Sequence, residues 1–161
     1  MSHVPEPVPG RGEVLVKVEA FSVNRGETFL LEPEPPYPPP AGWRPGKDIA
    51  GLVVQATADG DGPPTGQRVV AHPPAGGWAE YAAVPVDRLA TLPDGTDAAV
   101  AAALPLAGLT ALRLLRAAGA VAGNRVLITG ASGGVGHYFT ELATGAGGKV
   151  TAVSSRGERL A

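Results

Sequence analysis

The strongest chemical signal in the sequence is a glycine-rich segment that directly follows a run of apolar residues. Its seven residues are Gly130, Ala131, Ser132, Gly133, Gly134, Val135 and Gly136. Three glycines separated by two residues allow a tight turn, let the backbone approach a pyrophosphate and let a following helix pack closely on a sheet. The free amide groups at the start of that helix then face the anion. The segment therefore predicts a dinucleotide-binding turn in which these seven residues contact the cofactor.

The residues about twenty positions further along distinguish between the two nicotinamide dinucleotides. NAD-specific sites usually carry Asp or Glu there, whereas this chain has Ser154, Ser155 and Arg156. Small hydroxyls and a guanidinium suit a 2′-phosphate, which arginine can bind with two parallel hydrogen bonds. The alternative is an ordinary solvated arginine. We predict NADPH as the cofactor, bound in part by these three residues.

A metal centre is not expected. The chain contains no cysteine, which excludes disulfides, thiolate nucleophiles and zinc sites built from cysteine. Its three histidines, His3, His72 and His137, lack the spacing of metal ligands. The absence of disulfides suits the cytosol, and we predict a cytoplasmic protein.

The first half of the chain predicts short strands. Residues 13–21 alternate between apolar and polar side chains, as a half-buried strand does. Similar runs at 49–57, 67–72 and 78–84 are bounded by Gly, Pro or Asp, which favours an antiparallel barrel or sandwich. The proline-rich segment 32–46 cannot be helical. We interpret it as an extended surface connection, with a ligand for proline-binding domains as the alternative.

The second half predicts helices and a pair of parallel strands. Thr96 or Asp97 can cap a short alanine-rich helix, and residues 106–118 predict a second helix that ends at a glycine. Residues 125–129 and 150–153 are typical of buried strands, joined by a helix that begins within the glycine-rich turn and ends near residue 146. Such a crossover implies a parallel pair with a right-handed connection. This context favours a dinucleotide site over a merely flexible loop.

Four motifs occur in order along the chain, at residues 46–51, 77–81, 104–111 and 130–136. They resemble those of the medium-chain dehydrogenase/reductases, and most closely those of the zinc-free quinone oxidoreductase branch. The resemblance covers nearly all of residues 9–159. It implies a mixed α and β fold, with a GroES-like β-barrel catalytic domain over residues 1–105. The first βαβ unit of a Rossmann domain, a doubly wound parallel sheet, would follow over 106–161.

The same resemblance implies an oxidoreductase that transfers hydride from NADPH to a quinone or another α,β-unsaturated carbonyl acceptor. Asn24 and Thr110 would be the catalytic residues, Asn24 near the nicotinamide and acceptor and Thr110 near the cofactor. Asn24 could donate a hydrogen bond to a carbonyl that gains negative charge; the alternative is a turn residue that closes a strand. Zinc-dependent relatives carry His-Glu in place of Lys47-Asp48, so the resemblance implies a zinc-independent protein.

The resemblance also predicts that these 161 residues form only part of the fold, without the usual first strand and with two Rossmann strands. A mean sheet has about five or six strands, so two strands would leave apolar edges unpaired. We therefore expect a homo-oligomer or a complementing chain as partner. Two other interpretations stay open: a catalytically incompetent half-protein, or an interaction module that uses the proline-rich segment.

Composition limits the other partners. The formal net charge is −2, and without a basic face the chain is not expected to bind nucleic acid. The most apolar stretch, residues 98–122, is interrupted by Pro105, Arg113 and Arg116. A buried helical region is therefore expected there, and no membrane span.

Overall fold

The computed structural model describes residues 3–32 and 37–155. The chain forms two compact units, which meet in the sequence between Pro105 and Leu106. The first unit contains an antiparallel sheet with two short helices, and the second contains two longer helices and a pair of parallel strands.

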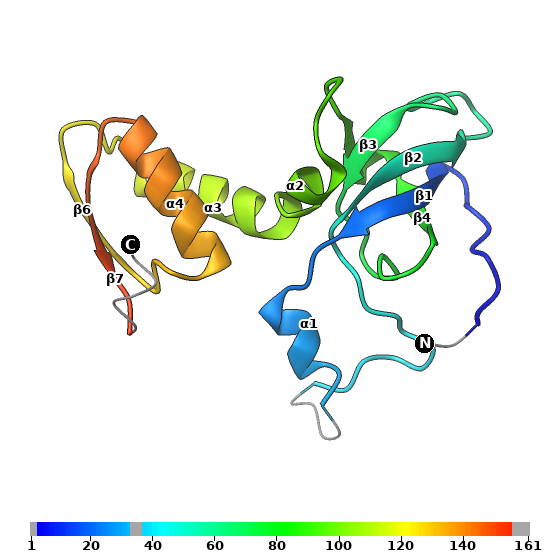
Figure 1. Ribbon diagram of the computed structural model, residues 1–161, viewed down its shortest axis with the longest axis horizontal. Coiled ribbons are helices and arrows are strands. Elements are labelled where there is room, and N and C mark those ends of the chain that lie inside the picture. The colour runs from blue at the N-terminus through cyan, green and yellow to red at the C-terminus, as the bar shows by residue number, and fades with distance from the viewer. Residues whose placement is uncertain (1–2, 33–36, 156–161) are drawn as a thin grey trace. The chain divides into compact units, whose positions relative to one another are not determined.

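The first unit is built on a curled antiparallel sheet with the spatial strand order β4-β1-β2-β3-β5 (Figure 1). Its strands are β1 (Glu13–Phe21), β2 (Ile49–Gln55), β3 (Arg68–Ala71), β4 (Tyr81–Pro85) and β5 (Leu89–Thr91). β1 pairs with β4 along one edge and with β2 along the other. The four strands expected from the sequence are confirmed, each within a few residues of its predicted bounds.

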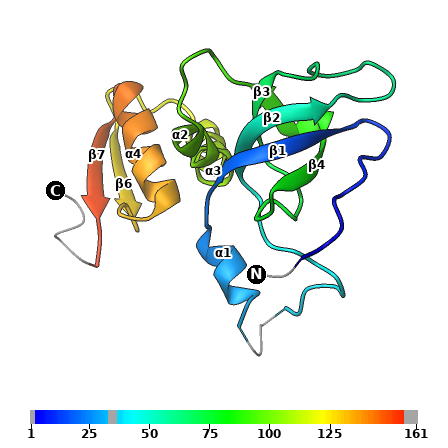
Figure 2. The same cartoon turned by 45° about the vertical axis from the view of Figure 1, so that its right-hand side comes forward.

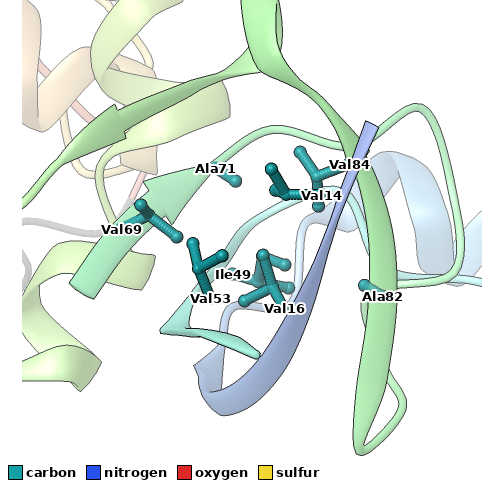
Figure 3. Packing of buried hydrophobic residues seen from close by; sticks show 8 residues of the cluster. All are labelled: Val14, Val16, Ile49, Val53, Val69, Ala71, Ala82 and Val84. Carbon is teal, nitrogen blue, oxygen red and sulfur yellow. The ribbon is translucent and has the colours of Figure 1, made fainter. Parts of the chain in front are cut away.

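The core of this sheet consists of small aliphatic side chains from four strands that point toward one another (Figure 3). They are Val14, Val16, Ile49, Val53, Val69, Ala71, Ala82 and Val84. Val14 and Val16 are fully buried, as the alternating pattern of β1 predicts, but Leu15 between them is also buried. The strict alternation holds only beyond Val16.

A short helix covers part of the sheet. Helix α2 (Ala98–Ala102) begins after Asp97, whose Oδ1 accepts hydrogen bonds from the backbone amides of Ala99 and Val100 at 2.8 and 3.0 Å. Asp97, rather than Thr96, is therefore the capping residue. The helix packs against β1, β2 and β3 through a cluster of small residues that includes Ala50, Ala101 and Ala102.

Three elements of the first unit were not expected from the sequence. They are α1 (Arg25–Phe29), the 3₁₀ turn η1 (Val86–Arg88) and β5. Each spans five residues or fewer, too short to show the periodicity on which a sequence-based prediction depends.

The second unit is a strand-helix-strand crossover with one additional helix. It consists of α3 (Pro105–Ala118), β6 (Arg125–Thr129), α4 (Gly134–Gly145) and β7 (Lys149–Val153). β6 and β7 are parallel and in register, and α4 lies along them (Figure 2). Phe139 of α4 is buried against Ala111 and Ala143. The mixed fold, with an antiparallel first part and the start of a Rossmann unit, is confirmed.

One face of the β6–β7 pair is open in the described part of the chain. Leu127 and Val153 project there with 69% and 44% of their surface exposed, while Val126 and Val150 face the α4 side. Within residues 3–32 and 37–155, the two strands pair with no strand other than each other. Exposed apolar faces and unpaired edges promote association between chains.

We expect the purified 161-residue chain to self-associate through this face, as light scattering will measure. Leu127→Lys should shift the distribution of oligomeric states toward monomer, because the lysine charge would have to be buried in the contact between two chains. Val8→Lys replaces a residue that is 89% exposed in the first unit and should leave the distribution unchanged. A monodisperse parent monomer would contradict this prediction.

Candidate functional site

The glycine-rich turn has the geometry that its sequence predicts. β6 ends at Thr129, Gly130 follows with φ of +67°, and α4 begins after Gly133. A Cβ on Gly136 would collide with the carbonyl oxygen of Gly130 and would approach the Cα of Ala131 to 2.7 Å. Gly136 therefore allows the first turn of α4 to lie directly against the chain that leaves β6.

The amide groups at the start of α4 are available to a ligand. Gly133 has no side chain to cap the helix, and the first amides of an α-helix have no intrahelical acceptor. Those of Gly134, Val135 and Gly136 belong to this first turn. Together with the positive end of the helix dipole, they form a site suited to a phosphate group.

Two of the predicted cofactor residues from different strands lie together. The hydroxyls of Ser132, in the turn, and Ser154, just after β7, are 2.8 Å apart. Ser155 follows directly, and Arg156 lies outside the described residues. Ala131 differs from the expectation, because it is buried and its amide donates to the carbonyl oxygen of Val153 at 3.1 Å. Its amide therefore joins the turn to β7 and is not free for a cofactor.

Thr110 lies in the second turn of α3 and is partly buried. Its hydroxyl donates to the carbonyl oxygen of Leu106 at 2.6 Å. A threonine hydroxyl has one hydrogen and two lone pairs. In this arrangement Thr110 can accept a hydrogen bond from a ligand, but it can donate one only if the bond to Leu106 breaks.

A polar network occupies the first unit around the carboxylate of Asp48, which is completely buried. Its side-chain partners include Ser22, Asn24 and His72. The Ser22 hydroxyl and the Asn24 amide donate to Oδ2 at 3.0 and 2.8 Å, and Nδ1 of His72 lies 2.9 Å from Oδ1. No buried side-chain nitrogen or oxygen among the described residues lacks a hydrogen-bond partner. Asp48 thus joins the end of β1, the start of β2 and the end of β3.

Glu27 is a second buried carboxylate beside this network, 2% exposed. It accepts hydrogen bonds from the backbone amides of Gly46, at 2.7 Å, and Asn24, at 3.3 Å. Glu27 is not among the site residues predicted from the sequence. The signal was present, because Asn followed three residues later by Glu is the spacing of a capping box.

The orientation of the Asn24 side chain follows from its neighbours. Its Nδ2 lies 2.8 Å from Asp48 Oδ2 and 3.3 Å from Glu27 Oε2. Ionised carboxylates only accept hydrogen bonds, so the amide must direct its NH₂ group at them. The predicted donation from Asn24 to an acceptor carbonyl would therefore require this amide to leave two carboxylates.

No group of three or more metal-ligating His, Asp or Glu side chains occurs in residues 3–32 and 37–155. Within the same residues, no helix has the length and hydropathy needed to cross a membrane. Zinc independence and the cytoplasmic location both stay predictions.

Comparison with known proteins agrees with the fold. Residues 10–94 match the alcohol dehydrogenase GroES-like domain family. The chain resembles the quinone oxidoreductase of Mus musculus, with 37% identity over 99% of this chain and 49% of the mouse protein. It also resembles the chloroplast envelope quinone oxidoreductase homolog of Arabidopsis thaliana, with 38% identity over 93% of this chain and 49% of the plant protein.

Among solved structures, the quinone oxidoreductase of Thermus thermophilus, also determined in complex with NADPH, superposes with a TM-score of 0.79. The two sequences are 34% identical over 98% of this chain and 50% of the Thermus chain. The chain thus spans about half the length of the relatives it matches. The chain belongs to the medium-chain dehydrogenase/reductase superfamily, in its quinone oxidoreductase branch.

Proposed function

We propose that this chain is part of an NADPH-dependent oxidoreductase that reduces a quinone or another α,β-unsaturated carbonyl compound without zinc. The observation that carries the proposal is the turn between β6 and α4, where open helix amides lie next to the Ser132–Ser154 hydroxyl pair. The relation to quinone oxidoreductases in mouse and Thermus supports it.

In this proposal NADPH supplies the hydride. The protein binds and orients NADPH and the acceptor, and it polarises the acceptor carbonyl. The amides of Gly134 and Val135 would hold the pyrophosphate, as helix N-termini do. Ser154, Ser155 and Arg156 would bind the 2′-phosphate. Thr110 would accept a hydrogen bond from the cofactor, and Asn24 would lie at the nicotinamide and the acceptor.

The test is NADPH binding, by fluorescence titration, together with NADPH oxidation in the presence of a quinone and, separately, an enone. We expect binding and two-electron reduction of the acceptor by the purified protein. If NADPH binds without oxidation by any acceptor, the non-catalytic half-protein is the better interpretation. The open β6–β7 face favours that alternative, because it offers a surface for a complementing chain.

We expect NADPH to bind more tightly than NADH. Arg156→Ala should reduce that difference by about 1.5–3 kcal/mol, the range for a hydrogen bond to a charged group. Arg113→Ala, on α3, removes a charge of the same kind elsewhere and should leave the preference intact. Equal affinities of the parent protein for NADPH and NADH would refute the assignment of the cofactor.

Metal independence gives a further expected result. Incubation with a strong chelator should leave NADPH oxidation unchanged, and elemental analysis should find no stoichiometric zinc, because cysteine ligands are absent from the chain. Loss of zinc and activity together would overturn this part of the proposal.

A further inference from the structure

Two partly buried serine hydroxyls join the glycine-rich turn to the end of β7. Oγ of Ser132, in the turn, lies 2.8 Å from Oγ of Ser154, which is the usual length of a hydrogen bond between two hydroxyls. A second bond lies next to it in the chain, where the Ala131 amide donates to the carbonyl oxygen of Val153 at 3.1 Å. The two hydroxyls are thus held together by the fold of the second unit itself.

The register of the two parallel strands explains why residues so far apart in sequence meet. Thr129, the last residue of β6, pairs with Val153, the last residue of β7. Ser132 follows the first strand and Ser154 follows the second, so both lie at the carboxyl edge of the strand pair. This is the edge at which open parallel sheets bind their ligands.

The hydroxyl pair contains two hydrogens, and their use is coupled. A serine hydroxyl has one hydrogen and two lone pairs, and either residue can be the donor in this contact. When Ser132 donates to Ser154, the hydrogen of Ser154 can be directed at a further acceptor. When Ser154 donates to Ser132, Ser154 can only accept a hydrogen bond from a further group. The direction of one bond thus decides whether Ser154 is a donor or an acceptor toward a ligand.

The two nicotinamide dinucleotides differ at the group that Ser154 would bind. The 2′-phosphate of NADPH presents oxygens that accept hydrogen bonds at neutral pH, so it requires Ser154 to donate. The 2′-hydroxyl of NADH both donates and accepts, and it can bind Ser154 in either arrangement. Only the binding of NADPH therefore depends on the direction of the bond between Ser132 and Ser154.

We propose that Ser132 is a positioning residue that determines the preference for NADPH: it donates to Ser154 and so directs the hydrogen of Ser154 at the 2′-phosphate. The inference rests on the proposed function, which assigns Ser154 to that phosphate. In a chain of two hydroxyls the first hydrogen bond polarises the second and strengthens it. Ser132 lies in the turn that would bind the pyrophosphate, yet its effect is on the choice between the two dinucleotides.

The test is the ratio of two dissociation constants, the Kd for NADH divided by the Kd for NADPH, measured on the full chain by fluorescence titration. Ser132→Ala removes the donor that orients the Ser154 hydroxyl. We expect the ratio to fall by about 2–10-fold, which corresponds to one ordinary hydrogen bond, while the Kd for NADH changes by less than about twofold. A purely structural role of Ser132 would instead weaken the binding of both dinucleotides alike.

A double-mutant cycle tests whether Ser132 acts through Ser154. Ser154→Ala alone should lower the ratio by about tenfold or more, because it removes a hydrogen bond to a charged group. Adding Ser132→Ala to Ser154→Ala should change the ratio no further, since the hydroxyl that Ser132 orients is then absent. Additive effects would mean that Ser132 acts on the dinucleotide directly, and they would overturn the proposal.

Two further variants control for the shape and the surroundings of Ser132. Ser132→Cys keeps a side chain of similar shape but replaces the hydroxyl with a thiol, which is a weak donor. It should lower the ratio as Ser132→Ala does, and a ratio equal to that of the parent would contradict the role of the hydroxyl. Thr144→Ala removes an exposed hydroxyl from α4 and should leave both dissociation constants unchanged.

The outcomes distinguish this inference from the proposed function. A parent protein that binds neither dinucleotide, or binds both equally, overturns the proposed cofactor and the role of Ser132 with it. A parent that prefers NADPH, but whose Ser132→Ala variant keeps the ratio or loses affinity for both dinucleotides alike, overturns the role of Ser132 alone.

Discussion

Asp48→Ala is expected to lower the free energy of unfolding of the first unit by about 4 kcal/mol, because several donors at a buried position lose their acceptor together. The substitution removes the acceptor for Ser22, Asn24 and His72 at a position with no exposed surface. Each donor would then be desolvated without a partner, which costs about 1–3 kcal/mol per group. Chemical denaturation followed by tryptophan fluorescence measures the change.

Two controls separate the network from a general effect of removing a carboxylate. Asp94→Ala removes an exposed aspartate near α2 and should change the stability by less than about 0.5 kcal/mol. Asp48→Asn keeps the volume of the side chain, but it places an NH₂ group where a carboxylate oxygen accepted hydrogen bonds. It should therefore retain only part of the stability that Asp48→Ala loses. If Asp48→Ala unfolds at the denaturant concentration of the parent, the three hydrogen bonds contribute nothing net to stability.

Gly136→Ala is expected to destabilise the second unit by about 3 kcal/mol and to abolish NADPH binding. The added methyl group would collide with the carbonyl oxygen of Gly130 and the Cα of Ala131. Both contacts are backbone atoms of the turn, which cannot move aside as a side chain could. Overpacking of this kind costs about 1–3 kcal/mol or more, and the shift displaces the amides that would bind the pyrophosphate.

Gly145→Ala, in the same helix, is the matched control and should raise the stability of the second unit where Gly136→Ala lowers it. A Cβ at Gly145 meets nothing within 4 Å, and alanine favours a helix by about 0.5–1 kcal/mol relative to glycine. We expect a small gain in stability and unchanged NADPH affinity. If both alanine variants behave alike, the close approach at Gly136 does not govern the turn.

The sequence predicted the second unit well because its signals are local. The apolar run 125–129 matches β6, and the glycines that follow mark the start of α4 within one residue of its observed beginning. Strand β1 was equally clear from its alternation. These patterns arise because one face of an element is buried. They can be recognised within a short stretch of sequence, without knowledge of distant residues.

The polar network was not predicted because its members come from distant positions. His72 and Asp48 are 24 residues apart, as are Asp48 and Asn24, and nothing in the local sequence of His72 distinguishes it from a surface histidine. Only the register of β2 with β3, which pairs Ile49 with Ala71, brings Asp48 beside His72. The prediction that Asn24 donates to a substrate carbonyl did not include its contacts with Glu27 and Asp48, because those contacts also depend on the folded structure.

The position of β1 in the sheet has a consequence for how the chain folds during synthesis. One edge of β1 pairs with β2, and the other pairs with β4. Glu13, for example, can pair with its partner Pro85 only after the ribosome has added β4. Contacts so distant in sequence form slowly, and the ribosome adds residues at about 5–20 per second. β1 therefore spends seconds with an unpaired edge. Its exposed charges, Lys17 and Glu19, are placed to discourage that edge from pairing with another nascent chain.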